Sequence, residues 1–511
     1  MHSRIGRAAA LVLVSLCLLL VGTVPAQAHG DRARNEQMRL LLKSEGTSTP
    51  LLSSNVVHQG NYPGDAGISG CFMDTKPLLV TSGVNAIEVW DIKDAVHPKV
   101  VGTLPQALFE NEAMNCGERQ TKHGVRRFVL IGVDSVQAAP TQPQHVNAGG
   151  KELIVVEVTD PANPTIVGRA PAATTSTHTV TCVKFTDCRY AYSAGDSKSG
   201  AFSIFDLRNI EKPQEVDSDP GKAGVQPFPS PTAGHKWNFD AAGFGTHTGW
   251  NGASIWDTSH PRDPRMVTTT GKAGKGTDPR YAGWNNFILH NSFRPNARDF
   301  QPDSSPSFAH GNVMLATEED YEQTDCSQAG SFQTWKVKSL SGTDRSAIVP
   351  LDKVELSDLE AQNGTQLPIP QQAFCSSHWF DFNSSGIVAV GFYGGGTQFI
   401  DARDPRHLKS FGYAFWGGSE VWDSMWVPIY DAQGHRTSRD SNVVYSIDLA
   451  RGLDVYSVDV PGEGGAAGHG TQPSGVPTAT AADRVSAAVV PLGLVGGAAG
   501  LALGLRRRRR R

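Results

Sequence analysis

Apolar and polar residues along this chain form a phrase of about a dozen residues that recurs seven times. Each clear copy contains a run of β-branched and aromatic residues, typical of a strand, followed by an acidic residue that ends it. In four copies a proline stands seven residues after the acid, where its fixed φ and missing N–H favour a turn. A second apolar run then predicts another strand. The copies read AIEVWDIKDAVHPKVVG, LIVVEVTDPANPTIVG, AFSIFDLRNIEKPQEV, ASIWDTSHPRDPRMV, FQTWKVKSL, TQFIDARDPRHLKSFG and LDVYSVDVP.

The spacing of these copies predicts the fold. Periods of this length are typical of repeat proteins in which one unit cannot bury its own apolar face. Radial stacking of four-stranded sheets buries those faces in a closed ring. We therefore expect an all-β fold, a seven-bladed β-propeller over residues 56–460. The positions after the apolar runs are Asp91, Glu157, Asp206, Asp257, Lys336, Asp401 and Ser457, with steps of 66, 49, 51, 79, 65 and 56 residues.

Two of the copies carry a family resemblance. Residues 153–164 and 399–405 resemble the LVIVD-repeat proteins, which are secreted or surface-attached bacterial β-propellers. The resemblance covers the region between the two ends of the chain and implies the propeller fold. It implies no particular activity, because propellers carry unrelated functions.

Both ends of the chain predict export to the cell surface. Residues 1–28 have a basic start, an apolar stretch and small residues at the cleavage position, which is typical of a signal peptide. Residues 29–55 would follow as an N-terminal extension. Residues 485–505 carry no charge and are long enough to cross a membrane, although they could instead be a sorting segment trimmed after export. Six arginines follow at residues 506–511.

The charges at the C-terminal end predict the orientation and the partners. The positive-inside rule places the arginine tail in the cytoplasm and the propeller on the extracellular face. Residues 461–484, rich in Gly, Ala, Pro and Thr, would be a flexible stalk. The formal net charge is −4 even with the arginines, so nucleic acid is not an expected partner. We expect contact with the membrane through the C-terminal segment, and an extracellular protein, glycan or small-molecule ligand.

Cysteine usage agrees with export. Of seven cysteines, Cys17 falls in the predicted signal peptide and six remain. An even number in an oxidising compartment predicts disulfides, although some of the six could be buried free thiols. No CxxC pair supports a zinc ribbon or a thioredoxin-like site. The candidate pairs are Cys182–Cys188 across a short turn, and Cys71–Cys116 and Cys326–Cys375 between neighbouring blades.

Histidines carry the candidate chemistry. Four units place one at the start of the predicted innermost strand: His178, His235, His290 and His378. Such positions point toward one mouth of the central channel, where imidazoles suit a transition metal such as copper, zinc or iron. The other units place Cys71, Glu112 or Asn115, and Asp423 there, and we expect Glu318 or Asp423 as the carboxylate partner. Alternatively, each histidine hydrogen-bonds to the neighbouring blade and stabilises ring closure.

A second resemblance concerns the same region. The stretches LHNSFRPN and GNVMLATEED are similar to the selenium-binding protein and methanethiol oxidase group. These are propellers with histidines in the central cavity and a copper-dependent activity. The resemblance implies a metal site and does not establish an oxidase.

Two function classes follow from the sequence. The first is a non-enzymatic, surface-tethered binding scaffold, since long insertions at residues 137–150, 217–234, 298–310 and 339–372 would offer recognition loops. The second is a secreted metal-dependent enzyme, copper oxidase-like, with the four histidines as ligands. They differ in one structural feature. Convergence of at least three imidazoles favours the metal-dependent enzyme.

Overall fold

The computed structural model describes residues 50–461, apart from residues 65–66, 84–85, 106–111, 113, 134–150, 196–199, 324 and 370–372. The predicted signal peptide, stalk, membrane segment and arginine tail lie outside the described residues, as does most of the N-terminal extension, and they remain predictions. Among the described residues, no helix combines the length and apolar character needed to cross a membrane.

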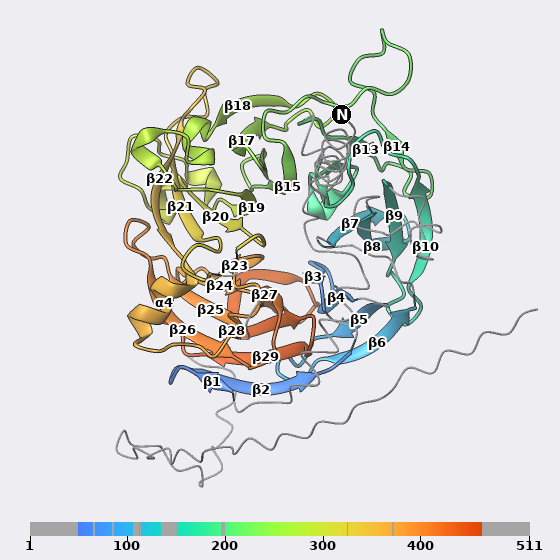
Figure 1. Cartoon of the computed structure of the whole chain (residues 1–511). Coiled ribbons are helices and arrows are strands. Elements are labelled where there is room, and N and C mark those ends of the chain that lie inside the picture. The colour runs from blue at the N-terminus through green and yellow to red at the C-terminus, as the bar shows by residue number, and fades with distance from the viewer. Residues whose placement is uncertain are drawn as a thin grey trace, which may run out of the picture. The chain divides into compact units, whose positions relative to one another are not determined.

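Seven antiparallel sheets stand in a ring around a common axis (Figure 1), so the predicted all-β, seven-bladed propeller is confirmed. Blades 1 to 3 each take four consecutive strands. Blade 1 contains β3 (Ser69–Phe72), β4 (Leu78–Ser82), β5 (Ile87–Asp91) and β6 (Lys99–Leu104). Blade 2 contains β7 (Asn115–Thr121), β8 (Gly124–Val133), β9 (Glu152–Glu157) and β10 (Thr165–Ala170). Blade 3 contains β11 (Val180–Cys182), β12 (Tyr190–Ser193), β13 (Ile204–Asp206) and β14 (Gln214–Glu215).

Blades 4 and 5 follow the same plan, and blades 6 and 7 each gain a strand from the N-terminal side. Blade 4 contains β15 (Gly234–Phe239), β16 (Phe244–Gly249), β17 (Gly252–Asp257) and β18 (Arg265–Thr269). Blade 5 contains β19 (Ile288–Phe293), β20 (Val313–Glu319), β21 (Phe332–Val337) and β22 (Ile348–Val354). Blade 6 contains β23 (Phe380–Phe382), β24 (Ile387–Gly391), β25 (Thr397–Asp401), β26 (Lys409–Phe415) and β1 (Leu51–Leu52). Blade 7 contains β27 (Val421–Tyr430), β28 (Arg436–Asp448), β29 (Gly452–Val458) and β2 (Val56–Tyr62).

Short helices occupy some of the connections. The insertion at residues 339–372, expected as a recognition loop, instead contributes β22 and the helix α4 (Leu356–Asn363). The fourth strand of blade 5 is therefore formed by residues that lack the repeat phrase. The 3₁₀ turns are η1 (Phe185–Asp187), η2 (Gly271–Lys275), η3 (Pro279–Tyr281), η4 (Ala297–Asp299) and η5 (Phe308–His310).

The repeat phrase corresponds to the third strand of each blade and the turn that follows. All seven aligned positions lie in third strands, from Asp91 in β5 to Ser457 in β29. The acid ends the strand because its carboxylate accepts a backbone N–H two residues later, as from Lys93 to Asp91 at 3.0 Å and from Arg403 to Asp401 at 3.1 Å.

Packing between blades explains the glycine at the end of the repeat phrase. A Cβ at Gly102 of β6 would lie 2.0 Å from the carbonyl oxygen of Pro161, in the turn of the next blade. A Cβ at Gly168 of β10 would lie 1.9 Å from the carbonyl oxygen of Ile210. Backbone approaches this close exclude any side chain. The repeat therefore encodes contact between blades as well as the strands within them.

Apolar residues fill the wedges between adjacent blades. One buried cluster joins Val80 and Val89 of blade 1 to Val129 and Ile154 of blade 2. Equivalent clusters lie between other neighbouring blades. Each blade is consequently stabilised by its neighbours, as expected for a repeat fold.

The structure contains the three expected disulfides. Cys71 of β3 bonds to Cys116 of β7, which joins the innermost strands of blades 1 and 2. Cys182 bonds to Cys188 across the turn after β11, and Cys326 bonds to Cys375 between blades 5 and 6. Disulfides of this kind are typical of an extracellular or otherwise oxidising environment.

Ring closure depends on strands from opposite ends of the propeller. β2 pairs antiparallel with β29, and His58 Nε2 lies 2.8 Å from Asp454 Oδ1 across this pair. Arg451 donates to the same carboxylate at 2.7 Å, and its guanidinium lies 3.8 Å from the ring centre of Trp416. Burial alone would raise the pKa of Asp454, but the hydrogen bonds from His58 and Arg451 outweigh it and lower that pKa.

Removing the disulfide between blades is expected to cost more than removing the one within a hairpin. A chain-entropy estimate gives about 4 kcal/mol for the Cys71–Cys116 link and about 2.4 kcal/mol for the Cys182–Cys188 link, since their residues are 45 and 6 positions apart. Urea unfolding of the two double Cys→Ala variants measures both losses. Equal losses would contradict a role in holding neighbouring blades together.

Asp454→Asn is expected to weaken the closure and change its pH dependence. Because the folded-state pKa of Asp454 is lowered, its contribution to stability is present above the unfolded pKa of about 4 and disappears as the pH falls through the folded value. We expect the variant to lose about 2–3 kcal/mol at pH 7 and part of the acid sensitivity. Urea unfolding between pH 2.5 and 7 tests this, with exposed Asp303→Asn as the control. An unchanged acid profile in Asp454→Asn would refute it.

Candidate metal centre

Four consecutive blades bring four histidines to one place in the channel. His178 lies just before β11, His235 is in β15, His290 is in β19 and His378 lies just before β23. His178 Nε2 lies 3.1 Å from His235 Nε2. The ring centres of His235 and His290 are 4.2 Å apart, as are those of His290 and His378. All four side chains are buried, so the imidazoles form one continuous cluster.

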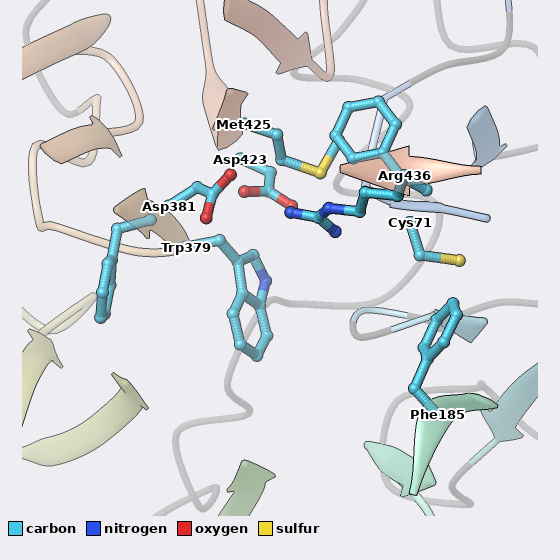
Figure 2. A pocket seen from close by; sticks show the side chains of 9 residues that line it. Cys71, Phe185, Trp379, Asp381, Asp423, Met425 and Arg436 are labelled. Carbon is cyan, nitrogen blue, oxygen red and sulfur yellow. The ribbon is translucent and has the colours of Figure 1, made fainter. Parts of the chain in front are cut away.

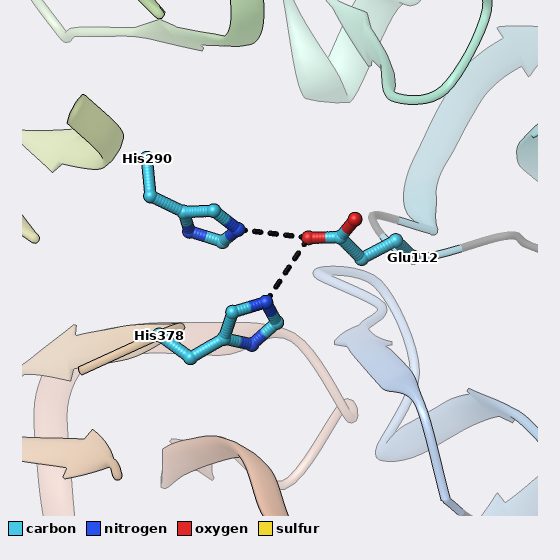
Figure 3. Close-up of side chains that lie close together, drawn as sticks. All are labelled: Glu112, His290 and His378. Atoms are coloured by element: carbon cyan, nitrogen blue, oxygen red, sulfur yellow. Dashed lines mark hydrogen bonds and ion pairs between the residues drawn. The ribbon is translucent and has the colours of Figure 1, made fainter. Parts of the chain in front are cut away.

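A glutamate from a fifth blade lies at the centre of this cluster. Glu112 lies just before β7, and its carboxylate is fully buried. One oxygen lies 2.5 Å from His178 Nε2, and the other lies 2.8 Å from His290 Nε2 and 3.1 Å from His378 Nε2. Figure 3 shows His290 and His378 pointing at this carboxylate. The Nε2 atoms of His178, His290 and His378 therefore all contact the same carboxylate.

A second buried carboxylate borders the cluster. Glu319, at the end of β20, places its oxygens 3.6 Å from His290 Nε2 and 3.8 Å from His378 Nε2. The Tyr393 hydroxyl donates to Glu319 Oε1 at 2.5 Å. Burial raises the pKa of Glu319 well above its ordinary value, and the charge of Glu112 adds to the effect. Two buried carboxyl groups beside the same imidazole favour a bound cation, which would offset the cost of burying them.

The hydrogen bond behind His378 shows which ring nitrogen carries a proton on the side away from Glu112. Its Nδ1 lies 2.7 Å from the Trp422 carbonyl oxygen, which can only accept, so Nδ1 carries the proton. In the neutral ring, Nε2 then directs its lone pair toward Glu112. Two acceptors at 3.1 Å need a proton or a metal ion between them. A backbone carbonyl that fixes the tautomer in this way is typical of metal-binding histidines.

His247 shows how a purely structural histidine differs. It is fully buried in β16, with Nε2 2.7 Å from the Ala194 carbonyl oxygen and Nδ1 2.8 Å from the Ser230 hydroxyl. Burial lowers its pKa to about 4, so the ring is neutral. Its partners hold blades 3 and 4 together, as in the interblade alternative considered from the sequence. The four clustered histidines instead face one another and a shared carboxylate.

The two carboxylates expected from the sequence, Glu318 and Asp423, lie outside the cluster. Glu319, the neighbour of Glu318 in the chain, borders the cluster instead. Glu318 accepts the backbone N–H of Phe287 at 3.0 Å and the hydroxyl of Ser331 at 3.1 Å, and burial raises its pKa to about 7. Successive residues of a strand point to opposite sides, so Glu319 faces the histidines where Glu318 cannot.

Asp423 of β27 belongs to a neighbouring pocket rather than to the cluster. It lies with Trp379, Asp381 and Arg436 around that pocket (Figure 2). Of the other residues at equivalent positions, Cys71 is disulfide-bonded, and the Asn115 side chain accepts the N–H of Cys182. Only Glu112 among these alternatives joins the histidines.

The donor set defines the chemistry available. Three groups combine ligand atoms that all lie within 4.8 Å of one another: Glu112, His290 and His378; Glu112, His178 and His235; and His235, His290 and Glu319. Imidazole with carboxylate suits first-row transition metals such as copper, zinc and iron. The feature that would favour the metal-dependent enzyme, convergence of at least three imidazoles, is met by His178, His290 and His378, whose Nε2 atoms lie within 3.1 Å of Glu112.

Comparison with known proteins shows no family for this chain. No family model matches the chain, and no curated protein matches it. Among solved structures, the chain is similar to the β-propeller domain of Myceliophteria thermophila Cps50 (Swd1), with 12% identity and a TM-score of 0.47 over 79% of this chain and 99% of that one. The fold assignment therefore depends on the seven sheets themselves, and the LVIVD and selenium-binding resemblances remain predictions.

Proposed function

We propose that this protein is an exported metal-dependent β-propeller that holds one first-row transition-metal ion in its channel and uses it on a small-molecule substrate. The observation that carries the proposal is the arrangement of four Nε2 atoms, from four blades, around the buried carboxylate of Glu112. A binding scaffold needs only its loops and rim. It does not account for so many titratable groups gathered where water is excluded.

The residues divide into two roles. His178, His235, His290 and His378 would supply the nitrogen ligands, with Glu112 as the anionic ligand, because it lies within 3.1 Å of three of them. Glu319, fixed by Tyr393, would balance the remaining positive charge from the side of His290 and His378. When bound, such an ion supplies Lewis acidity and, if it is copper or iron, electron-transfer chemistry.

The disulfides support the oxidising, extracellular compartment that the proposal includes. All six cysteines outside residues 1–28 are paired, so no thiolate competes for the metal. A site without thiolate or thioether ligands favours Cu(II), Zn(II) or Fe(II) over soft ions such as Cu(I). Tethering to the cell surface through residues 485–505 remains part of the proposal on sequence grounds alone.

The purified exported chain is expected to contain about one equivalent of copper, zinc or iron per chain. His290→Ala and Glu112→Gln should reduce the occupancy at least about tenfold, because each removes a group at the centre of the cluster. Inductively coupled plasma mass spectrometry measures the metal content. Exposed His97→Ala and buried His247→Ala are matched controls that should retain the ion, the latter despite a loss of stability.

A wild-type chain that is metal-free and takes up none of the three ions on dialysis would refute the proposal. The interblade role of the histidines and a scaffold function would then remain. Equal metal loss in His247→Ala and His290→Ala would also count against it, since that result would reflect unfolding rather than a lost ligand.

Metal loading is expected to stabilise the fold. An ion that binds only the folded chain contributes about 2.7 kcal/mol at a free concentration of 100 times its Kd. Differential scanning calorimetry of the chelator-treated and reloaded chain should show a higher Tm after loading. Glu112→Gln should lose most of that increase while His97→Ala keeps it. An identical Tm with and without the ion would argue against a site built from four blades.

A further inference from the structure

A pocket of about 240 Å³ lies beside the histidine cluster and is formed by different blades. Its walls come from Trp379 and Asp381 of blade 6, Asp423 and Met425 of blade 7, and Cys71 and Phe72 of blade 1. The histidines come from blades 3 to 6. The channel is thus divided between an imidazole cluster and an adjoining pocket.

Burial shows how the pocket is oriented. Arg436 is 38% exposed at its side chain, and Phe185 of η1 is also partly exposed, so these residues lie at the entrance. Trp379 and Asp423 are buried and form the floor. A molecule entering past Arg436 would therefore meet the tryptophan and the aspartate last.

Trp379 separates the pocket from the cluster. Its ring centre lies 4.4 Å from that of His290 and 5.5 Å from that of His378. A molecule packed against the pocket side of this indole would be one ring away from two of the proposed metal ligands. This position suits a substrate of the proposed centre.

The charged residues around the pocket indicate which kind of molecule it would bind. Figure 2 shows the carboxyl groups of Asp381 and Asp423 together at the pocket, with the Arg436 guanidinium directed toward them. Arg436 also pairs with Asp74 at 3.8 Å. Buried Lys236 interacts with Asp423 but is shared with Glu112 of the cluster. Three carboxyl groups thus face one full and one shared cation, so the carboxyl groups outnumber the cations that could pair with them.

The floor of the pocket could accept a positive charge and an apolar body together. Burial, with the charge of Asp381, raises the pKa of Asp423 to about 8, which a bound cation would offset. The Lys236 Nζ lies 4.9 Å from the ring centre of Trp379, so this indole already contacts one cation. The rings of Phe72 and Phe185 and the thioether of Met425 would contact an aromatic or alkyl group.

We propose that this pocket binds a small organic ammonium, an amine with an aromatic or alkyl body, with its nitrogen between Asp381 and Asp423 and its body among the aromatic rings. The role of this amine as a substrate rests on the proposed metal centre. Its binding does not, because none of the proposed ligands lines the pocket.

The test uses phenethylammonium chloride as the probe, titrated into the full exported chain by isothermal calorimetry. We expect saturable one-to-one binding, weakened about tenfold or more in Asp381→Asn and in Asp423→Asn, because each removes a charge-assisted contact. Asp303→Asn, at an exposed aspartate in the connection between β19 and β20, is the matched control and should bind as wild type. Trp379→Phe, which keeps a ring at the floor, should bind with a smaller loss.

Probes of the same shape decide between charge types. Phenethyl alcohol should bind at least about tenfold more weakly than the ammonium. Tighter binding of phenylacetate would overturn the proposal and assign the pocket to anions held by Arg436. Absence of ammonium binding by the folded wild type, or equal binding by the Asp381 and Asp423 variants, would overturn it as well.

The same titration on His290→Ala separates this inference from the metal proposal. Unchanged ammonium binding in that variant is expected, since His290 does not line the pocket. A chain that binds the ammonium but no metal would refute the metal centre and leave the pocket assignment standing. A chain that binds metal but not the ammonium would refute the pocket assignment and leave the metal centre standing.

Discussion

The candidate site depends on closure of the propeller ring. Glu112, the four histidines and Tyr393 come from five blades and are separated by as many as 281 positions in the sequence, and they meet only because the seven sheets surround one axis. Closure is made by β2, which adds the outer strand to blade 7, and it is held by the bonds from His58 and Arg451 to Asp454. An open stack of the same sheets would spread these side chains apart.

The cost of burying charge is the physical reason for proposing a function for this cluster. Glu112 and Glu319 are fully buried beside four imidazoles, and burial drives the pKa of Glu319 upward. A fold stabilised only by packing would place apolar residues there, as it does between the blades. His247 is an example of a buried histidine with a structural role, because its ring nitrogens bond to a backbone carbonyl and to a hydroxyl. The clustered histidines instead direct their Nε2 atoms toward Glu112 and one another.

The position of the proposed amine pocket beside the proposed metal centre follows from the same geometry. Inner strands of a propeller converge on the axis, so neighbouring blades can line different parts of one channel. Here blades 3 to 6 contribute the imidazoles, and blades 6, 7 and 1 contribute the carboxyl pair and the apolar walls. Trp379 belongs to both because it packs on His290 and lines the pocket. The indole therefore couples the two parts physically.

The sequence by itself determined the number of blades, the position of each third strand and the four histidines, because these depend on local pattern and on a period the chain repeats. It offered the three cysteine pairs as candidates, and the structure contains them. Tertiary structure alone decided between Glu318 and Glu319, because a strand alternates its side chains and only packing shows which side faces the axis. Tertiary structure also shows that Glu112 rather than Asn115 contacts the histidines, and that Asp423 lines the neighbouring pocket. These residues lie in segments with no repeat pattern or in different blades, and their meeting depends on how the ring closes.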